Sequence, residues 1–215
     1  MSDRVPRISD DYHKVFEGKK LFKKIKWLGV PILKYPNDAF IIQEIIFEVY
    51  PDILIECGTA KGGSSLFFAS IMEVMGRGMV YTIDIEKNLD LTGKAVWPAY
   101  RRIRTITGKS TDQKIVSDLK EIIKGRKVMV VLDSDHREEN VAKELKIYSD
   151  FVSRESYLIV EDTHVNGNPF EWPYGRGPME AVQGFLARDD RFVVDESREK
   201  LIMTSNPFGY LRRIK

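Results

Sequence analysis

The stretch "DILIECGTAKGGSSLFFAS", residues 52–70, decides the fold. A short apolar run is followed by a polar turn that contains Gly58, Gly62 and Gly63, and then by apolar residues at helical spacing. In an α/β sheet, ligands bind at the carboxyl ends of the strands, where the chain turns into the next helix. The stretch therefore predicts a strand, a turn and a helix at which a ligand can approach the backbone.

Strands and helices continue to alternate from Pro51 to the C-terminus. We expect strands at 52–58, 78–86, 102–110, 127–135, 156–163, 191–196 and 200–206, and helices at 64–76, 111–125, 137–152 and 177–189. Apolar strands separated by helices are typical of a mostly parallel sheet that is buried on both faces. The pattern predicts an α/β fold with a doubly wound sheet.

The composition suits one domain with a full core. Of 215 residues, 43% are hydrophobic, and 34 Lys+Arg balance 32 Asp+Glu to a formal charge of +2. This balance does not indicate a nucleic-acid partner.

Cys57 is the single cysteine, so an internal disulfide is excluded and a buried thiol is expected. No signal peptide and no run of about 20 apolar residues is seen, which predicts a soluble, cytoplasmic protein without a membrane span.

Residues 1–40 precede the first strand and are expected to form an N-terminal helical arm or lid, ahead of a ligand-binding domain at 41–215. Within the arm, "KKLFKKIKWLG", residues 19–29, predicts a basic helix that packs an apolar face on the domain. That face would consist of Leu21, Phe22, Ile25 and Trp27. A role of the basic segment 19–26 in binding a membrane or RNA is the alternative.

A second unusual region is the loop "HVNGNPFEWPYGRGP", residues 164–178. Long loops rich in glycine, proline and aromatic residues are usually lids or binding loops in a compact domain. We expect this loop to close over a bound acceptor, with Phe170, Trp172 and Tyr174 stacking on its rings.

The glycine turn is led by an acid, Glu56, and matches neither the dinucleotide pattern nor a phosphate-binding loop. Asp84 ends the next strand, where a carboxylate can accept hydrogen bonds from two ribose hydroxyls. Two acids placed this way suit a nucleoside that carries an amino acid and no phosphate, such as S-adenosylmethionine. Ordinary packing of a helix on a strand is the alternative. The candidate cofactor-binding residues are Glu56, Gly58, Thr59, Gly62, Ser64, Asp84, Ser110 and Asp112.

Ser110 and Asp112 follow the third strand, where either side chain could meet an adenine edge. The alternative for Ser110 is structural, because Ser110 with Gln113 three residues later forms the pattern of a capping box at the start of a helix.

Three carboxylates follow two neighbouring strands. Asp133 ends the strand at 127–135, and Glu161 and Asp162 end the strand at 156–163. Carboxylates that converge repel one another unless a cation or protons intervene. An all-oxygen set suits a hard ion, so we expect Mg²⁺ on Asp133, Glu161 and Asp162. The alternative is that these acids are helix caps.

Two of the three histidines, His136 and His164, directly follow these acidic motifs, and His13 lies in the arm. Histidine is the usual general base near neutral pH, so we expect His136 to act with Asp133 in catalysis. The alternative for His136 is a surface position without a catalytic role. For His164, a surface position is what we expect.

Several motifs together resemble one family, that of the cephalosporin hydroxylases and rhamnosyl O-methyltransferases. They are "WLGVPILKYPND", "DILIECGTAKGGSS", "VMVVLDSDH", "YLIVEDTHVNGNP", "GPMEAV" and "GYLRRI". The resemblance implies the class I S-adenosylmethionine-dependent methyltransferase fold, whose seven-stranded Rossmann-like sheet has its last strand antiparallel. The runs "RFVVDE" and "KLIMTSN" fit the closing pair of strands.

The resemblance also implies an activity. Relatives that methylate sugars of macrolide antibiotics hold Mg²⁺ on residues that match Asp133, Glu161 and Asp162, and use the match of His136 as general base. Catechol methyltransferases, which are more distant, have lysine at that place. The implied reaction is O-methylation of a sugar, a glycosylated natural product or a glycolipid, most simply one with a rhamnose-type acceptor, by a homo-oligomer.

One departure from the family pattern is visible at Thr163-His164, where Thr-Asn is usual.

Two other functions stay open at this point. A non-haem iron oxygenase would need two histidines and a carboxylate, for which His136, Glu138 and His164 are the candidates, although such enzymes usually have an antiparallel β scaffold. A silent cofactor-binding protein would have no need of the acid cluster.

Overall fold

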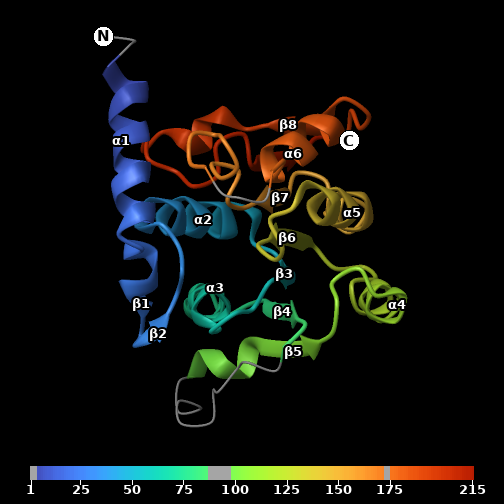
Figure 1. The fold of residues 1–215 in the computed structure, drawn as a ribbon. Helices are drawn as coiled ribbons and strands as arrows, with labels where there is room; N and C mark the ends of the chain where they lie inside the picture. Colours follow the sequence, from blue (N-terminus) through green and yellow to red (C-terminus); the bar gives the residue numbers. More distant parts are fainter. Residues whose placement is uncertain (1–3, 87–97, 172–174) are drawn as a thin grey trace.

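The computed structural model describes residues 4–86, 98–171 and 175–215. Its centre is a sheet of seven strands: β3 (Ile53–Cys57), β4 (Met79–Asp84), β5 (Ile103–Thr107), β6 (Val128–Leu132), β7 (Tyr157–Val160), β8 (Phe192–Val194) and β9 (Tyr210–Arg213). The strand order is β5-β4-β3-β6-β7-β9-β8, and Figure 1 shows the succession from β5 to β7. β9 runs antiparallel to both β7 and β8, and the other neighbouring strands are parallel. The predicted doubly wound α/β sheet is confirmed.

Helices cover both faces of the sheet, as the apolar strands require. On one face lie α2 (Pro36–Val49) and α3 (Gly63–Val74), and on the other lie α4 (Gln113–Ile122), α5 (Glu138–Tyr148) and α6 (Pro178–Leu186) (Figure 1). Every residue of β3, β6 and β7 is buried. Short 3-10 helices, η2 (Pro98–Arg102) and η3 (Glu196–Glu199), precede β5 and follow β8.

The N-terminal region starts with α1 (Arg4–Gly18), which stands beside the sheet domain in Figure 1. The basic helix predicted at 19–29 is wrong. One 3-10 turn, η1 (Leu21–Lys24), is followed by an antiparallel pair, β1 (Lys26–Trp27) and β2 (Val30–Pro31). A left-handed backbone at Lys20 (φ 51°) interrupts the helical path.

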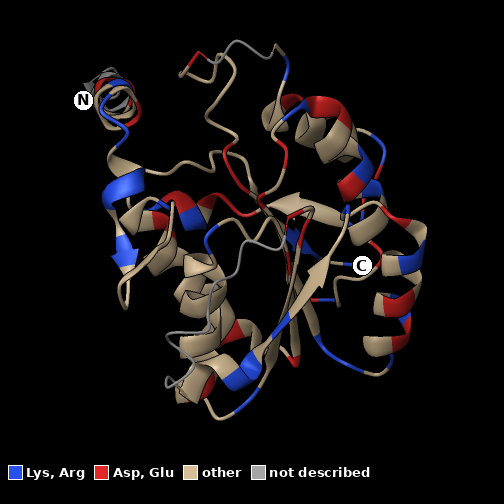
Figure 2. Cartoon of the chain, turned by 60° about the horizontal axis from the view of Figure 1, so that its bottom comes forward, with Lys and Arg blue, Asp and Glu red and all other residues tan. Residues whose placement is uncertain are grey.

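The predicted packing of the arm holds in part. Ile25 and Trp27 pack against the core cluster to which α2 and α3 contribute, and the Trp27 indole donates a hydrogen bond to Ser70 Oγ at 3.1 Å. The division of the chain into an arm and a domain at residue 40 stays a prediction. Residue 40 lies within α2. Figure 2 shows basic and acidic residues interspersed over the helices, in agreement with the near-neutral charge.

The strand predicted at 200–206 is also wrong, because the last strand of the sheet is β9. Leu201 and Ile202 are exposed, and Ile202 has a left-handed backbone (φ 70°). Residues 204–206 instead form a buried loop held by Asp38 of α2. The Asp38 carboxylate accepts hydrogen bonds from the Ser205 backbone N–H and hydroxyl, both at 2.7 Å, and from the Thr204 hydroxyl.

Cys57 is a buried free thiol, as predicted. Within the described ranges, no helix has both the length and the apolar character needed to cross a bilayer.

The approach of β2 to the start of α3 provides a test of the fold. A Cβ atom added to Gly63 would lie 2.1 Å from the Pro31 carbonyl oxygen, whereas one added to Gly184 in α6 meets nothing within 4 Å. We expect Gly63→Ala to lower the free energy of unfolding by about 2 kcal/mol or more. The control, Gly184→Ala, should raise it by about 0.5–1 kcal/mol, because alanine is the better helix former. Urea denaturation measures both, and a Gly63→Ala protein as stable as the control contradicts this packing.

Candidate active site

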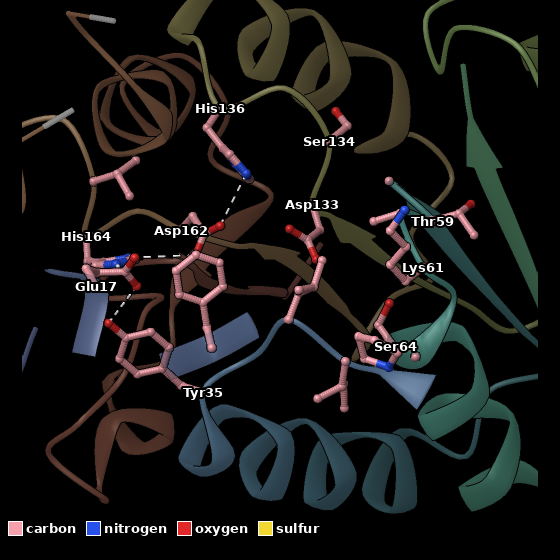
Figure 3. Close-up of a pocket in the computed structure, with 18 residues that line it drawn as sticks. Glu17, Tyr35, Thr59, Lys61, Ser64, Asp133, Ser134, His136, Asp162 and His164 are labelled. Carbon is pink, nitrogen blue, oxygen red and sulfur yellow. Dashed lines mark hydrogen bonds and ion pairs between the residues drawn. The ribbon is translucent and has the colours of Figure 1, made fainter. Parts of the chain in front are cut away.

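The carboxyl ends of β6, β7 and β3 lie side by side, because Cys57 pairs with Leu132 and Leu132 with Val160 in register. Asp133 and the Glu161–Asp162 pair follow these strands directly. Asp133 and Asp162 lie close together, as the sequence predicts (Figure 3).

A lysine that the sequence analysis missed lies among these acids. Lys34, just after β2, is buried, and its Nζ donates to Asp133 Oδ2 at 2.9 Å and to Glu161 Oε2. Burial lowers the pKa of Lys34, but Asp133 and Glu161 outweigh burial and raise it above its usual value. Burial raises the pKa of Glu161 well above the ordinary value despite the lysine. Lys34 is thus an internal cation that offsets the repulsion among the carboxylates.

Asp162 lies between two histidines. Its Oδ2 is 3.2 Å from His136 Nε2 and its Oδ1 is 3.8 Å from His164 Nδ1. Asp133, His136 and Asp162 each offer one ligand atom, and these atoms all lie within 4.8 Å of one another. Glu161 contributes a buried Oε1 that has no hydrogen-bond partner among the described residues.

These donors fit a divalent ion. Asp133 and Asp162 each offer a carboxylate oxygen within 4.8 Å of the other, and the orphaned Glu161 oxygen needs a partner of positive character, so the oxygens suit a hard ion. The ligand set Asp133, Glu161 and Asp162 stays a prediction, with Glu161 bound to Lys34 in this structure.

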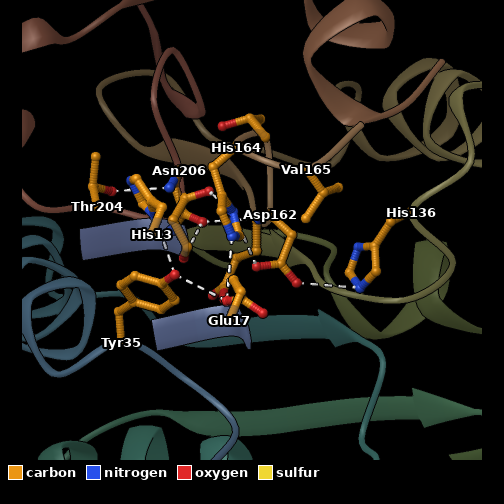
Figure 4. Close-up of polar contacts among 12 residues, drawn as sticks. His13, Glu17, Tyr35, His136, Asp162, His164, Val165, Thr204 and Asn206 are labelled. Atoms are coloured by element: carbon orange, nitrogen blue, oxygen red, sulfur yellow. Dashed lines mark hydrogen bonds and ion pairs between the residues drawn. The ribbon is translucent and has the colours of Figure 1, made fainter. Parts of the chain in front are cut away.

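The arm supplies a second polar cluster next to Asp162 (Figure 4). Glu17 Oε1 accepts a hydrogen bond from the Tyr35 hydroxyl at 2.9 Å and lies 3.3 Å from His164 Nε2. His13 Nδ1 lies 3.1 Å from the same hydroxyl, and its ring stacks on His164. Burial lowers the pKa of His164, but Glu17 and Asp162 raise it above the usual value. Burial and the neighbouring His164 lower the pKa of His13 to about 4.

Among the described residues, two cavities meet at this edge of the sheet. The first, of about 200 Å³, lies between the arm and the strand ends. The second, of about 470 Å³, extends past Asp84 and Lys109 towards α5. Both are lined by Gly58, Ala60, Asp133 and Ser134. A ligand in each cavity would therefore meet the other ligand beside Asp133.

The glycine turn forms the boundary between the cavities. Gly58 has a positive φ of 100°, and a Cβ there would lie 1.8 Å from the Asp133 carbonyl oxygen, so only glycine fits. Gly62 is the left-handed residue before α3. Thr59 and Ser64 line the first cavity.

Asp84 lines the second cavity at the end of β4, as predicted. Its Oδ2 accepts hydrogen bonds from the Thr59 and Ala60 N–H groups at 3.0 and 2.8 Å, and its Oδ1 accepts one from the Glu86 N–H at 3.0 Å. The carboxylate therefore also fixes the turn. A carboxylate has about four acceptor positions, so the donors among the described residues leave one for a ligand hydroxyl, where two were expected.

Glu56 is fully buried below the turn and lines neither cavity. Its Oε2 accepts a hydrogen bond from the Ser65 hydroxyl, and its Oε1 has no partner in the part of the chain that the structure describes. Burial raises the pKa of Glu56, while Lys34 acts to lower it.

The alternative for Ser110, a capping box with Gln113, is wrong. Asp112 caps α4 by accepting hydrogen bonds from the N–H groups of Lys114 and Ile115 at 2.8 and 3.3 Å. The Ser110 hydroxyl turns the other way and donates to the buried Glu144. Ser110 lines the second cavity, whereas Asp112 is absent from its described lining.

In the loop at 164–178, His164 is buried rather than at the surface, with 1% of its side chain exposed. Phe170 closes a turn by donating its N–H to the His164 carbonyl oxygen at 3.1 Å. Trp172 and Tyr174 lie outside the described residues, so the expected stacking and closure of this loop stay predictions.

Comparison with known proteins decides the family. The sequence profile of the rhamnosyl O-methyltransferase/CmcI family matches residues 19–214. The chain belongs to this family. A rhamnosyl O-methyltransferase of Mycobacterium bovis is 34% identical over 218 residues, which cover 96% of this chain and 85% of that protein. One from Mycobacterium leprae is 34% identical over 184 residues, covering 83% and 77%.

The fold of this rhamnosyl O-methyltransferase/CmcI family member also matches a solved structure, that of CmcI with Mg and SAM. The TM-score is 0.67 at 21% identity, and the match covers 90% of this chain and 78% of that one. The predicted family and fold class are confirmed.

Lys34, Glu17 and Tyr35 are the site residues that the sequence reasoning missed. The signal for Lys34 was present, because a single lysine interrupts the apolar run "VPILKYP" and a lysine buried there needs an acidic partner. Nothing in the spacing of Glu17 points to His164, which lies 147 positions later.

The lowered pKa of His13 predicts a loss of stability in acid. The folded protein resists protonation of His13 between its unfolded pKa of about 6.5 and its folded pKa of about 4, so unfolding becomes easier as the pH falls through that window. The expected contribution is about 3 kcal/mol, from 1.36 kcal/mol per pH unit. Urea denaturation at pH 7, 5.5 and 4 measures it. The His13→Gln variant should lose less stability than the wild type, and parallel losses would assign the effect to other groups.

Proposed function

We propose that the protein transfers the methyl group of S-adenosylmethionine to a hydroxyl of a sugar, in a rhamnose-bearing glycolipid or glycosylated natural product. The observation that carries the proposal is the pair of cavities that meet at Asp133, one beside Asp84 and the other beside His136. A methyl transfer needs two ligands held in contact, and this arrangement provides it. Membership of the rhamnosyl O-methyltransferase/CmcI family supports the choice of reaction.

The second cavity suits the methyl donor. Asp84 retains acceptor capacity for a ribose hydroxyl, and Ser110 lies further along the same wall. Gly58 allows the donor to approach the backbone, and the Asp84 hydrogen bonds to the turn hold that backbone in place. CmcI, whose fold this chain matches, has been solved with Mg and SAM, which supports SAM as the methyl donor.

The first cavity suits the acceptor. His136 is 19% exposed at its wall, so a bound hydroxyl can reach the imidazole. His136 would accept the hydroxyl proton, and Asp162 Oδ2, 3.2 Å from Nε2, would stabilise the imidazolium that forms. Asp133 and Asp162, together with Glu161, would hold Mg²⁺. When bound, a divalent ion supplies positive charge that lowers the pKa of a neighbouring hydroxyl.

The iron oxygenase is less well supported. Glu138, which it would need beside His136 and His164, pairs instead with Arg176, at 2.5 Å between Oε2 and Nε. Its carboxylate is not part of the cluster that Asp133, His136 and Asp162 form among the described residues. The homo-oligomer and the cytoplasmic location stay predictions from the sequence and its resemblance.

The test is methyl transfer from labelled S-adenosylmethionine, with Mg²⁺, to a panel of rhamnosides and other glycosides. We expect label on at least one rhamnoside. Asp133→Asn should lower kcat about 100-fold, since it removes a negative charge that would help to hold the ion. Asp118→Asn, which alters an exposed carboxylate on α4, is the matched control and should retain wild-type activity.

Two outcomes would count against the proposal. If no glycoside accepts label while S-adenosylmethionine binds in a calorimeter, the acceptor class is wrong. If label is transferred and Asp133→Asn leaves kcat unchanged, the acid cluster has no part in the reaction.

A further inference from the structure

Glu17 is far from the sheet in sequence and yet lies at the acceptor cavity. It is the second-last residue of α1, and only 9% of it is exposed. Its Oε1 is shared between the Tyr35 hydroxyl at 2.9 Å and His164 Nε2 at 3.3 Å. Burying a carboxylate costs free energy, and neighbouring Phe16 already supplies the apolar packing of α1 against Tyr35. Apolar packing alone therefore does not account for a buried glutamate at position 17.

His164 is held on both sides of its ring. Nε2 faces Glu17, and Nδ1 lies 3.0 Å from the Ser205 carbonyl oxygen. Ser205 is itself fixed by Asp38, through two hydrogen bonds of 2.7 Å. With 1% of the side chain exposed and His13 stacked on one face, the ring has a single orientation.

Asp162 lies between this fixed ring and His136. Its Oδ1 faces His164 Nδ1 at 3.8 Å, and its Oδ2 faces His136 Nε2 at 3.2 Å. The backbone of Asp162 is left-handed (φ 57°), and its N–H donates to Asn206 Oδ1 at 2.9 Å. The carboxylate therefore meets a fixed partner on one side and the histidine at the cavity wall on the other (Figure 4).

We propose that Glu17 and His164 are positioning residues, which orient Asp162 and, through it, His136. The arm would then be part of the active site, because α1 supplies the first member of a chain of contacts that ends at the acceptor. The inference rests on the proposed function only for the roles of Asp162 and His136. The contacts among Glu17, His164, Asp162 and His136 are present without S-adenosylmethionine or a sugar substrate.

The first test reads the coupling without any substrate. The chain has three histidines, so a long-range ¹H–¹⁵N NMR spectrum of the ring nitrogens can be assigned with single variants. Glu17→Ala should shift the ring signals of both His164 and His136. Glu17→Gln keeps an acceptor oxygen and should restore most of the wild-type His136 signal. Phe16→Leu loosens the packing of the same helix on Tyr35 but removes no hydrogen-bonding group, and should leave the His136 signal unchanged.

The second test measures function with kinetics and Mn²⁺ affinity, the latter by electron paramagnetic resonance. Removing an outer partner of a ligand typically costs about 10- to 100-fold in affinity or activity, so Glu17→Ala should lower kcat or Mn²⁺ affinity within that range. The KM for S-adenosylmethionine should stay within about twofold, because the donor cavity is not touched. Glu17→Ala and His164→Ala should not be additive, since both break one chain.

The inference is overturned if Glu17→Ala moves His164 alone and kcat is normal, or if Phe16→Leu changes His136 as much as Glu17→Ala does. The second result would mean that the arm matters only through its general packing. If no acceptor is methylated but the NMR coupling is seen, the positioning stands and the proposed function fails. The two failures are thereby distinguishable.

Discussion

The ion pairs of Lys34 with Asp133 and Glu161 are the interaction on which the site depends. Parallel strands necessarily bring their carboxyl ends to one edge, and here that edge carries Asp133, Glu161 and Asp162. Without a cation, carboxylates packed this closely repel one another and are costly to keep ionised. Lys34 meets two of them, is itself buried, and provides the positive charge from within the chain.

The same short segment ties the arm to the rest of the protein. Lys34 reaches the ends of β6 and β7, Tyr35 donates to Glu17 of α1, and Asp38 holds the loop at 204–206. That loop in turn supplies the Ser205 carbonyl that faces His164 and the Asn206 side chain that binds the Asp162 backbone. The geometry around Asp162 thus depends on three distant parts of the sequence that meet at residues 34–38. A change in any of them is expected to reach the acceptor cavity.

Much of the sheet could be predicted from the sequence, because hydrophobic periodicity reports local burial. The strands ending at Cys57, Asp84 and Leu132 are apolar runs bounded by turns, so the amino-acid pattern alone places their carboxyl ends and the acids there. The closing strand could not be placed in this way. "KLIMTSN" has strand composition, but Leu201 and Ile202 are exposed, and Asp38 holds the residues that follow. Periodicity carries no information on hydrogen bonds made across 166 positions.

The candidate site, like the sheet, could be predicted from the sequence only in part. Asp133, Asp162 and His136 lie together as predicted, since topology fixes where adjacent strands end. Lys34, Glu17 and Tyr35 come from a segment before the first strand of the sheet, and no rule of strand order says where such a segment packs. The basic run 19–29 was misleading for a related reason. The run has the composition of a basic helix. The left-handed backbone at Lys20 and the antiparallel pairing of Lys26–Trp27 with Val30–Pro31 give a 3-10 turn and a short hairpin instead.

A double-mutant cycle on Lys34 and Glu161 tests this account most directly, with the free energy of unfolding in urea as the measured quantity. Lys34→Met leaves buried carboxylates without their cation and should cost about 3–5 kcal/mol. Adding Glu161→Gln removes one of those charges, so the double variant should be more stable than Lys34→Met alone. If the two losses simply add, Lys34 and Glu161 are not coupled, and the lysine does not hold the acid cluster together.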